Sequence, residues 1–263
     1  MSILDWIANN TRGGLGPRRN ARDEPRFVVA APMKTASQSV YASLQNAFGS
    51  RHIYHTHRLG AEIAAGEKLT HRSYVKQVRA LRALADRSAP QFIVTIMRDP
   101  VARLYSNIFH REAALIARAA AMDDLDSISG VLWARASAIL DRNKDYYIRE
   151  FLPLGLNIMA PNTEVGRTFL VFRMEDLEVT FPATLKRVTG KQVSLIHKND
   201  ASHYGPPTAY DWLKRRFVLP SGLIDELYED KVVRHFYTDG EIRAFRERLR
   251  SNARKKSSEP LTV

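Results

Sequence analysis

One stretch near the N-terminus constrains the fold more than any other, because it predicts a buried strand that turns directly into a helix. An apolar run occupies residues 27–31 and suits a strand that is covered on both faces. Val40, Leu44 and Phe48 then recur at helical spacing. Residues 34–39 therefore lie where the strand becomes a helix.

The turn itself has the composition of an anion-binding site. Backbone N–H groups at the start of a helix have no intrahelical partner, and the helix dipole adds partial positive charge there. Lys34 supplies a full positive charge, and the hydroxyls of Thr35, Ser37 and Ser39 add donors. We therefore predict that this turn binds a phosphate or sulfate group.

The turn differs from the phosphate-binding loop G-x-x-x-x-G-K-[ST], because residues 32–39 contain no glycine. They read Pro-Met-Lys-Thr-Ala-Ser-Gln-Ser and resemble the 5′-phosphosulfate loop of sulfotransferases, typically Pro-Lys-Thr-Gly/Ala-Ser/Thr-Ser/Thr-Ser, with Met33 as a departure. The resemblance implies that this loop holds the 5′-phosphosulfate of 3′-phosphoadenosine 5′-phosphosulfate (PAPS). The residues that it implicates are Lys34, Thr35, Ala36, Ser37, Gln38 and Ser39.

A second motif follows the apolar run at 91–97, which predicts another buried strand. Arg98 at the end of that strand and Ser106 on the following helix are placed to converge on one anion. The segment 98–106 resembles the 3′-phosphate motif of sulfotransferases, Arg-Asp-Pro-x-x-Arg-x-x-Ser. The resemblance implies that Arg98 and Ser106 bind the 3′-phosphate of PAPS, at the sheet edge where open α/β folds bind ligands.

The alternation of strand and helix patterns predicts an α/β fold. We expect a single P-loop-like domain over 26–250, with a central, mostly parallel sheet of about four to five strands. Helices flank the sheet and form the C-terminal part. Residues 1–25 are predicted to be a flexible arm, and 251–263 a disordered basic tail. Strands are expected at 27–31, 53–57, 91–97 and 168–173, and further helices at 70–88, 103–121, 127–142, 181–189, 207–218, 221–235 and 239–250.

Charge and composition limit the partners. The formal charge of +12 favours an anionic partner, but no nucleic-acid-reading module is visible, so we expect a nucleotide rather than nucleic acid. The absence of cysteine excludes disulfides, thiolate zinc sites and thiol catalysis, and favours the cytoplasm. The sequence contains no run of about 18 apolar residues, so we expect no insertion into a membrane. The oligomeric state stays open.

Two histidines are candidates for the catalytic base. His55 and His57 are two residues apart in the predicted strand 53–57, so both project to one face. The segment resembles the His-x-His of hexuronic-acid 2-O-sulfotransferases, which implicates this pair in catalysis. We favour His57 as the base because it is nearer the strand end, with His55 orienting the acceptor or sharing the role. Glu62 and Glu67 are weaker candidates.

Together the motifs predict a sulfotransferase that passes the sulfonate of PAPS to a carbohydrate hydroxyl and releases 3′-phosphoadenosine 5′-phosphate (PAP). Segments 235–237 and 241–242 resemble bacterial proteins of capsular polysaccharide synthesis, which suggests a surface polysaccharide or glycolipid as acceptor. No metal is expected. A nucleotide kinase with a P-loop-like turn is one alternative, but Asp99 belongs to the arginine motif and no convincing magnesium ligand is visible. A non-catalytic binder of nucleotides or polyanions is the other.

Overall fold

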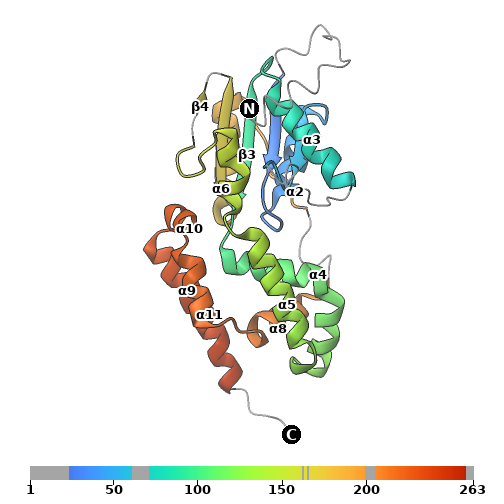
Figure 1. Cartoon of the computed structure of the whole chain (residues 1–263), viewed down its shortest axis with the longest axis vertical. Coiled ribbons are helices and arrows are strands. Elements are labelled where there is room, and N and C mark those ends of the chain that lie inside the picture. Colours follow the sequence, from blue (N-terminus) through green and yellow to red (C-terminus); the bar gives the residue numbers. More distant parts are fainter. Residues whose placement is uncertain (1–23, 61–70, 162, 165, 199–204, 259–263) are drawn as a thin grey trace. The chain divides into compact units, whose positions relative to one another are not determined.

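The computed structural model describes residues 24–60, 71–161, 163–164, 166–198 and 205–258. Contacts between residues group the chain into two compact units (Figure 1). Unit 1 comprises Met1–Met97 and Asp145–Lys198, and unit 2 comprises Arg98–Lys144 and Asn199–Val263. Within the described residues, the sheet belongs to unit 1 and unit 2 is helical.

The sheet of unit 1 is mostly parallel. Its order is β2-β1-β3-β5-β4, in which β4 is antiparallel to β5 and the other neighbours are parallel. The strands are β1 (Arg26–Ala30), β2 (Ile53–Thr56), β3 (Gln91–Met97), β4 (Thr163–Glu164) and β5 (Arg167–Arg173). The predicted α/β class, with a parallel sheet and a helical C-terminal part, is confirmed.

The strand order creates a topological switch point at β1. The chain passes from β1 to β2 on one side and then returns to β3 on the other side of β1. At such a point the connections that leave neighbouring strands diverge, and open α/β sheets bind their ligands just beyond the carboxyl ends of those strands. The loop that follows β1 therefore starts at the most favourable ligand position of this sheet.

Both faces of the sheet are covered. Every residue of β1 and β3 is buried, as the near-continuous apolar patterns of these segments predict. Helices α2 (Ser37–Phe48) and α7 (Leu177–Thr189) share one core with the sheet. This core includes Phe27, Val29, Val40, Leu44, Val94, Ile96, Phe172, Phe181 and Leu185. Helices α3 (His71–Ala85) and α6 (Tyr146–Phe151) lie in front of the strands in Figure 1.

Unit 2 is built around its own apolar core. Its helices are α4 (Pro100–Met122), α5 (Asp126–Asn143), α8 (Pro207–Arg216), α9 (Ser221–Glu229), α10 (Lys231–Phe236) and α11 (Asp239–Ser258). Asp99 is the N-cap of α4, because its Oδ1 accepts hydrogen bonds from the N–H groups of Val101 and Ala102. The Tyr228 hydroxyl donates to the same oxygen at 3.0 Å. One oxygen of Asp99 therefore joins the start of α4 to Tyr228 of α9.

Several boundaries differ from the sequence prediction. The predicted helix 221–235 is two helices, because Asp230 leaves the helical conformation and caps α10 through the N–H groups of Val232 and Val233. Helix α11 continues to Ser258, into the segment 251–263 that the sequence predicts to be disordered. Helix α6 and the short η2 (Leu152–Leu154), η3 (Met174–Asp176) and β4 were not predicted. Most of the predicted arm 1–25 lies outside the described residues.

Among the helices of the described ranges, none combines the length and the apolar composition needed to cross a membrane.

Candidate functional site

The loop between β1 and α2 has an unusual backbone. Lys34 and Ala36 adopt left-handed conformations, with φ of 66° and 60°. Neither is glycine, and the left-handed region costs an L-residue about 1–2 kcal/mol. Backbone strain of this kind concentrates at ligand clamps and active sites, where the conformation itself is useful.

This conformation leaves a row of backbone donors unused. The N–H groups of Thr35, Ala36, Ser37 and Gln38 form no hydrogen bond with any described residue. The first intrahelical acceptor is the carbonyl of Ala36, which receives the N–H groups of Ser39 and Val40. Consecutive N–H groups at a helix start form a concave site for an anion. No acidic residue occupies the first turn of α2, so nothing there opposes a negative ligand.

The hydroxyls of the loop are unequally available. Thr35 donates to the carbonyl of Pro32 at 2.8 Å. Ser39 donates to the carbonyl of Lys198 at 3.3 Å and accepts the Lys198 N–H at 3.0 Å. Ser37 Oγ lies 3.1 Å from Nε2 of His55, and which of the two donates depends on the tautomer of the ring. The contact of Gln38 with Nδ1 assigns the ring hydrogen to Nε2, and with that tautomer Ser37 keeps its own proton for a ligand.

The His55 ring is fixed by the loop. Its Nδ1 lies 3.4 Å from Nε2 of Gln38, which is a donor, so Nδ1 accepts. Its Nε2 then carries the hydrogen and donates to Ser37 Oγ at 3.1 Å. Burial, followed by the nearby His57, lowers the pKa of His55 to about 3. Because both nitrogens are engaged and the ring stays neutral, this geometry gives His55 an orienting role.

The His57 ring is arranged differently. Its Nδ1 lies 2.9 Å from the carbonyl oxygen of Ala31, so Nδ1 carries the hydrogen and donates. Its Nε2 forms no hydrogen bond within the described residues and keeps a lone pair. Burial lowers the pKa of His57, and the charge of Lys76 adds to this effect. The two histidine rings meet edge to face, with centroids 4.8 Å apart.

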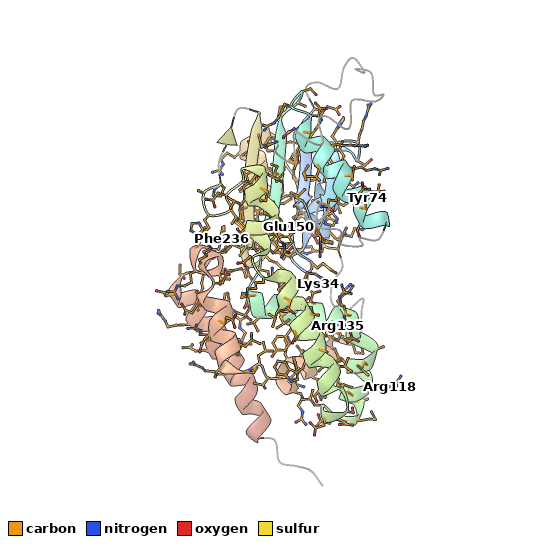
Figure 2. The ribbon with its side chains drawn as sticks, viewed as in Figure 1. Lys34, Tyr74, Arg118, Arg135, Glu150 and Phe236 are labelled. Carbon is orange, nitrogen blue, oxygen red and sulfur yellow. The ribbon has the colours of Figure 1, made fainter. Side chains whose placement is uncertain are left out.

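The structure therefore brings together in unit 1 most of the residues nominated from the sequence. The loop residues 34–39 and both histidines lie around the end of β1, where Figure 2 labels Lys34. The half-buried Arg98 and the buried Ser106 belong to unit 2, at the start of α4 and within it. Glu62 and Glu67 lie outside the described residues.

Three side chains of this region were missed in the sequence. Tyr146 and Glu150 of α6 and Gln77 of α3 all hydrogen-bond the backbone of segment 57–60. The sequence contains one sign of this arrangement. Glu150 lies four residues after Tyr146 and next to the apolar Phe151, so its carboxylate is placed on a buried face of the helix. Its partners are about 90 residues away in the chain, and no local pattern indicates them.

In the parts of the chain that the structure describes, no group of three or more His, Cys, Asp or Glu side chains is arranged to hold a metal ion. Comparison of this chain with protein-family models, with curated proteins and with solved structures found no match in any of the three.

Proposed function

We propose that the protein is a sulfotransferase that transfers the sulfonate of PAPS to a hydroxyl group of a carbohydrate. The observation that carries the proposal is the loop after β1, where four consecutive backbone N–H groups without a partner among the described residues adjoin Lys34. Such a row of donors suits a charged oxyanion, and the sequence of the loop resembles that of the 5′-phosphosulfate loop.

The second support is the position of His57. Its Nδ1–H bond to Ala31 ties the ring to the residue that begins the loop, and leaves Nε2 as the acceptor for a proton. A lowered pKa keeps this nitrogen unprotonated at neutral pH. A proton acceptor and an oxyanion site on adjacent segments are the two elements that transfer to a hydroxyl requires.

In the proposed reaction, His57 Nε2 takes the proton of the acceptor hydroxyl as its oxygen forms the new bond to sulfur. The bond between sulfur and the bridging oxygen breaks, and negative charge develops on the departing 5′-phosphate of PAP. Lys34 and the N–H groups of 35–38 stabilise that charge from fixed positions, and Ser37 adds a hydroxyl donor. His55 holds Ser37 and orients the loop. Arg98 and Ser106 of unit 2 are assigned the 3′-phosphate on their sequence motif.

Thermal shift with nucleotides tests which sulfonate donor the protein binds, and 5′-AMP, which lacks the 3′-phosphate, serves as the control for PAP. We expect PAP to stabilise the protein more than 5′-AMP, because only PAP carries the 3′-phosphate assigned to Arg98 and Ser106. Ligand at about 100 times its dissociation constant adds roughly 2.7 kcal/mol to the unfolding free energy. Equal stabilisation by PAP and 5′-AMP would contradict the 3′-phosphate assignment alone, whereas no response to PAP contradicts the donor.

Activity is tested by transfer of labelled sulfonate from PAPS to acidic and neutral polysaccharides. The positive net charge favours an acidic acceptor, such as a capsular or other surface polysaccharide. We place the reaction in the cytoplasm because the chain contains no cysteine. PAP binding without transfer to any acceptor would favour the non-catalytic binder, and phosphoryl transfer from ATP that requires magnesium would favour the kinase.

A further inference from the structure

The segment that carries the proposed base is held by hydrogen bonds at almost every peptide. Thr56 Oγ1 bonds both the carbonyl oxygen and the N–H of Arg58, at 2.8 and 3.2 Å. Gln77 of α3 donates to the carbonyl oxygen of Gly60 at 3.2 Å. The remaining contacts come from one short helix, α6. A segment between strand and helix has no ladder to fix it, so side chains must satisfy its backbone.

Helix α6 grips this segment at two points. The Tyr146 hydroxyl donates to the carbonyl oxygen of His57 at 2.7 Å. Glu150, four residues later on the same helix face, accepts the N–H groups of Leu59 and Gly60 through Oε2, at 2.7 and 2.6 Å. The approach is close: a Cβ on Gly60 would lie 2.7 Å from the carbonyl oxygen of Arg149. Only glycine allows the helix and the segment to meet in this way.

Anchoring a loop with the buried carboxylate of Glu150 costs free energy. Glu150 is 1% exposed, and its Oε1 has no hydrogen-bond partner in the described part of the chain. Its charged neighbour, Arg149 Nε, is 3.5 Å from Oε1. Burying an ionised group is costly unless it is fully paired, and an apolar side chain would pack at lower cost. What the carboxylate adds is a fixed position for two adjacent peptides.

We infer that α6 is a positioning element for His57, and that Tyr146 and Glu150 are its positioning residues. Tyr146 fixes the backbone of His57 itself, and Glu150 fixes the two residues that follow Arg58. The ring can then keep its Nδ1–H bond to Ala31 and hold Nε2 in one place. This role rests on the proposed function only in that His57 is the base there; the geometry of the ring can be measured without any reaction.

The neighbouring residue Tyr147 provides a matched control. Its hydroxyl donates to the carbonyl oxygen of Ile96 at 2.9 Å, which ties α6 to β3 rather than to segment 57–60. Tyr146 and Tyr147 are 5% and 7% exposed. Replacing either with Phe removes from α6 a hydroxyl that donates to a backbone carbonyl. A merely structural helix would therefore respond to both changes in the same way.

The first measurement is the titration of the His57 ring by NMR, assigned with the variant His57→Gln. Among the described residues, ionisable groups that interact with this ring or its backbone include His55 of β2, Lys76 of α3 and Tyr146 of α6. In Tyr146→Phe we expect the ring to become better hydrated, so its pKa rises towards 6.5 by about half a pH unit or more. In Tyr147→Phe the pKa stays that of the wild type. Equal changes in both variants, or none in Tyr146→Phe, overturn the inference.

Two substitutions of Glu150 test whether a conservative change preserves the positioning of His57. Glu150→Gln keeps one acceptor oxygen and Glu150→Ala keeps none, so the His57 pKa should change less in the Gln variant. In the transfer assay, Tyr146→Phe should lower kcat about 10- to 100-fold with unchanged PAP affinity, and Tyr147→Phe should not. If the wild type transfers no sulfonate, the proposed function fails, and the NMR comparison still decides whether α6 positions His57.

Discussion

The hydrogen bonds of the loop hydroxyls predict that Ser37 and Ser39 have separable roles. With the His55 tautomer assigned above, the Ser37 hydroxyl can still donate to a ligand, whereas the Ser39 hydroxyl donates to the carbonyl of Lys198. Ser37→Ala removes one hydrogen bond to a charged group, about 1.5–3 kcal/mol. We therefore expect the dissociation constant for PAP to rise about 10- to 150-fold. Ser39→Ala should leave that constant nearly unchanged.

For Ser39→Ala we expect an effect on stability instead. Ser39→Ala removes both bonds to the backbone of Lys198, at 3.0 and 3.3 Å. Lys198 is exposed, so water replaces part of what is lost, and we expect a cost of about 1 kcal/mol. For a chain of this size, that corresponds to a fall in Tm of about 2–4 °C. Ser43 is a second control, because its hydroxyl joins the Ser39 carbonyl to the N–H of Ile196 and faces no predicted ligand.

Isothermal titration calorimetry with PAP gives the dissociation constants, and thermal unfolding without ligand gives Tm. We predict that Ser37→Ala binds PAP weakly, and that Ser39→Ala and Ser43→Ala are less stable but bind PAP normally. An equal loss of PAP affinity in Ser37→Ala and Ser39→Ala would refute the assignment of protons, because Ser39 would then have to release Lys198 in order to bind ligand.

Four further predictions concern charge and pH. Lys34→Ala should lower kcat about 10²- to 10³-fold in assays of sulfonate transfer, and transfer by the wild type should survive EDTA; strict dependence on a divalent metal would contradict this. His57→Asn should still bind PAP but lose about 10²- to 10⁴-fold in rate. In the wild type, the rate should rise with pH through a pKa below 6.5, since that pKa is lowered and the neutral ring is the base; a rise only above pH 7 would argue against His57. Because the folded pKa of His55 is lowered to about 3, its contribution to stability is complete above pH 6.5 and is lost as pH falls towards 3, by roughly 2 kcal/mol at pH 5. Urea unfolding at pH 7 and pH 5 should show a smaller loss in His55→Gln than in the wild type.

Local patterns in the sequence identified most of the elements. The strand 91–97 was predicted with the bounds that β3 has, because a near-continuous run of β-favouring residues fits a strand covered on both faces. The same reasoning predicted a strand at 27–31, which matches β1 to within one residue, and placed the turn from strand to helix within 34–39, where α2 begins at Ser37. The prediction of one helix at 221–235 was wrong in one respect. Asp230 interrupts the apolar periodicity and caps α10, so the segment forms two helices, α9 and α10.

The roles of individual side chains could not be predicted in the same way. Alternation along the predicted strand 53–57 places His55 and His57 on one face, but β2 ends at Thr56, so His57 follows the strand. The difference between the two rings depends on Gln38, Ser37 and Ala31. These partners lie on other segments, and their hydrogen bonds form only after β1, β2 and α2 have packed. The choice of His57 over His55 came from its place near the strand end, and the structure adds a free Nε2 within the described residues as a physical reason.

By itself, the sequence determined the α/β class, the strand-to-helix turn at the end of β1, and the residue types that make this turn suitable for an anion. These properties depend on short-range periodicity and on donors that follow one another in the chain. Tertiary structure alone decided the strand order that places a switch point at β1, the commitment of the Ser39 hydroxyl to Lys198, and the hold of α6 on segment 57–60. These contacts join residues about 90 to 160 positions apart, and their geometry exists only once the core has packed.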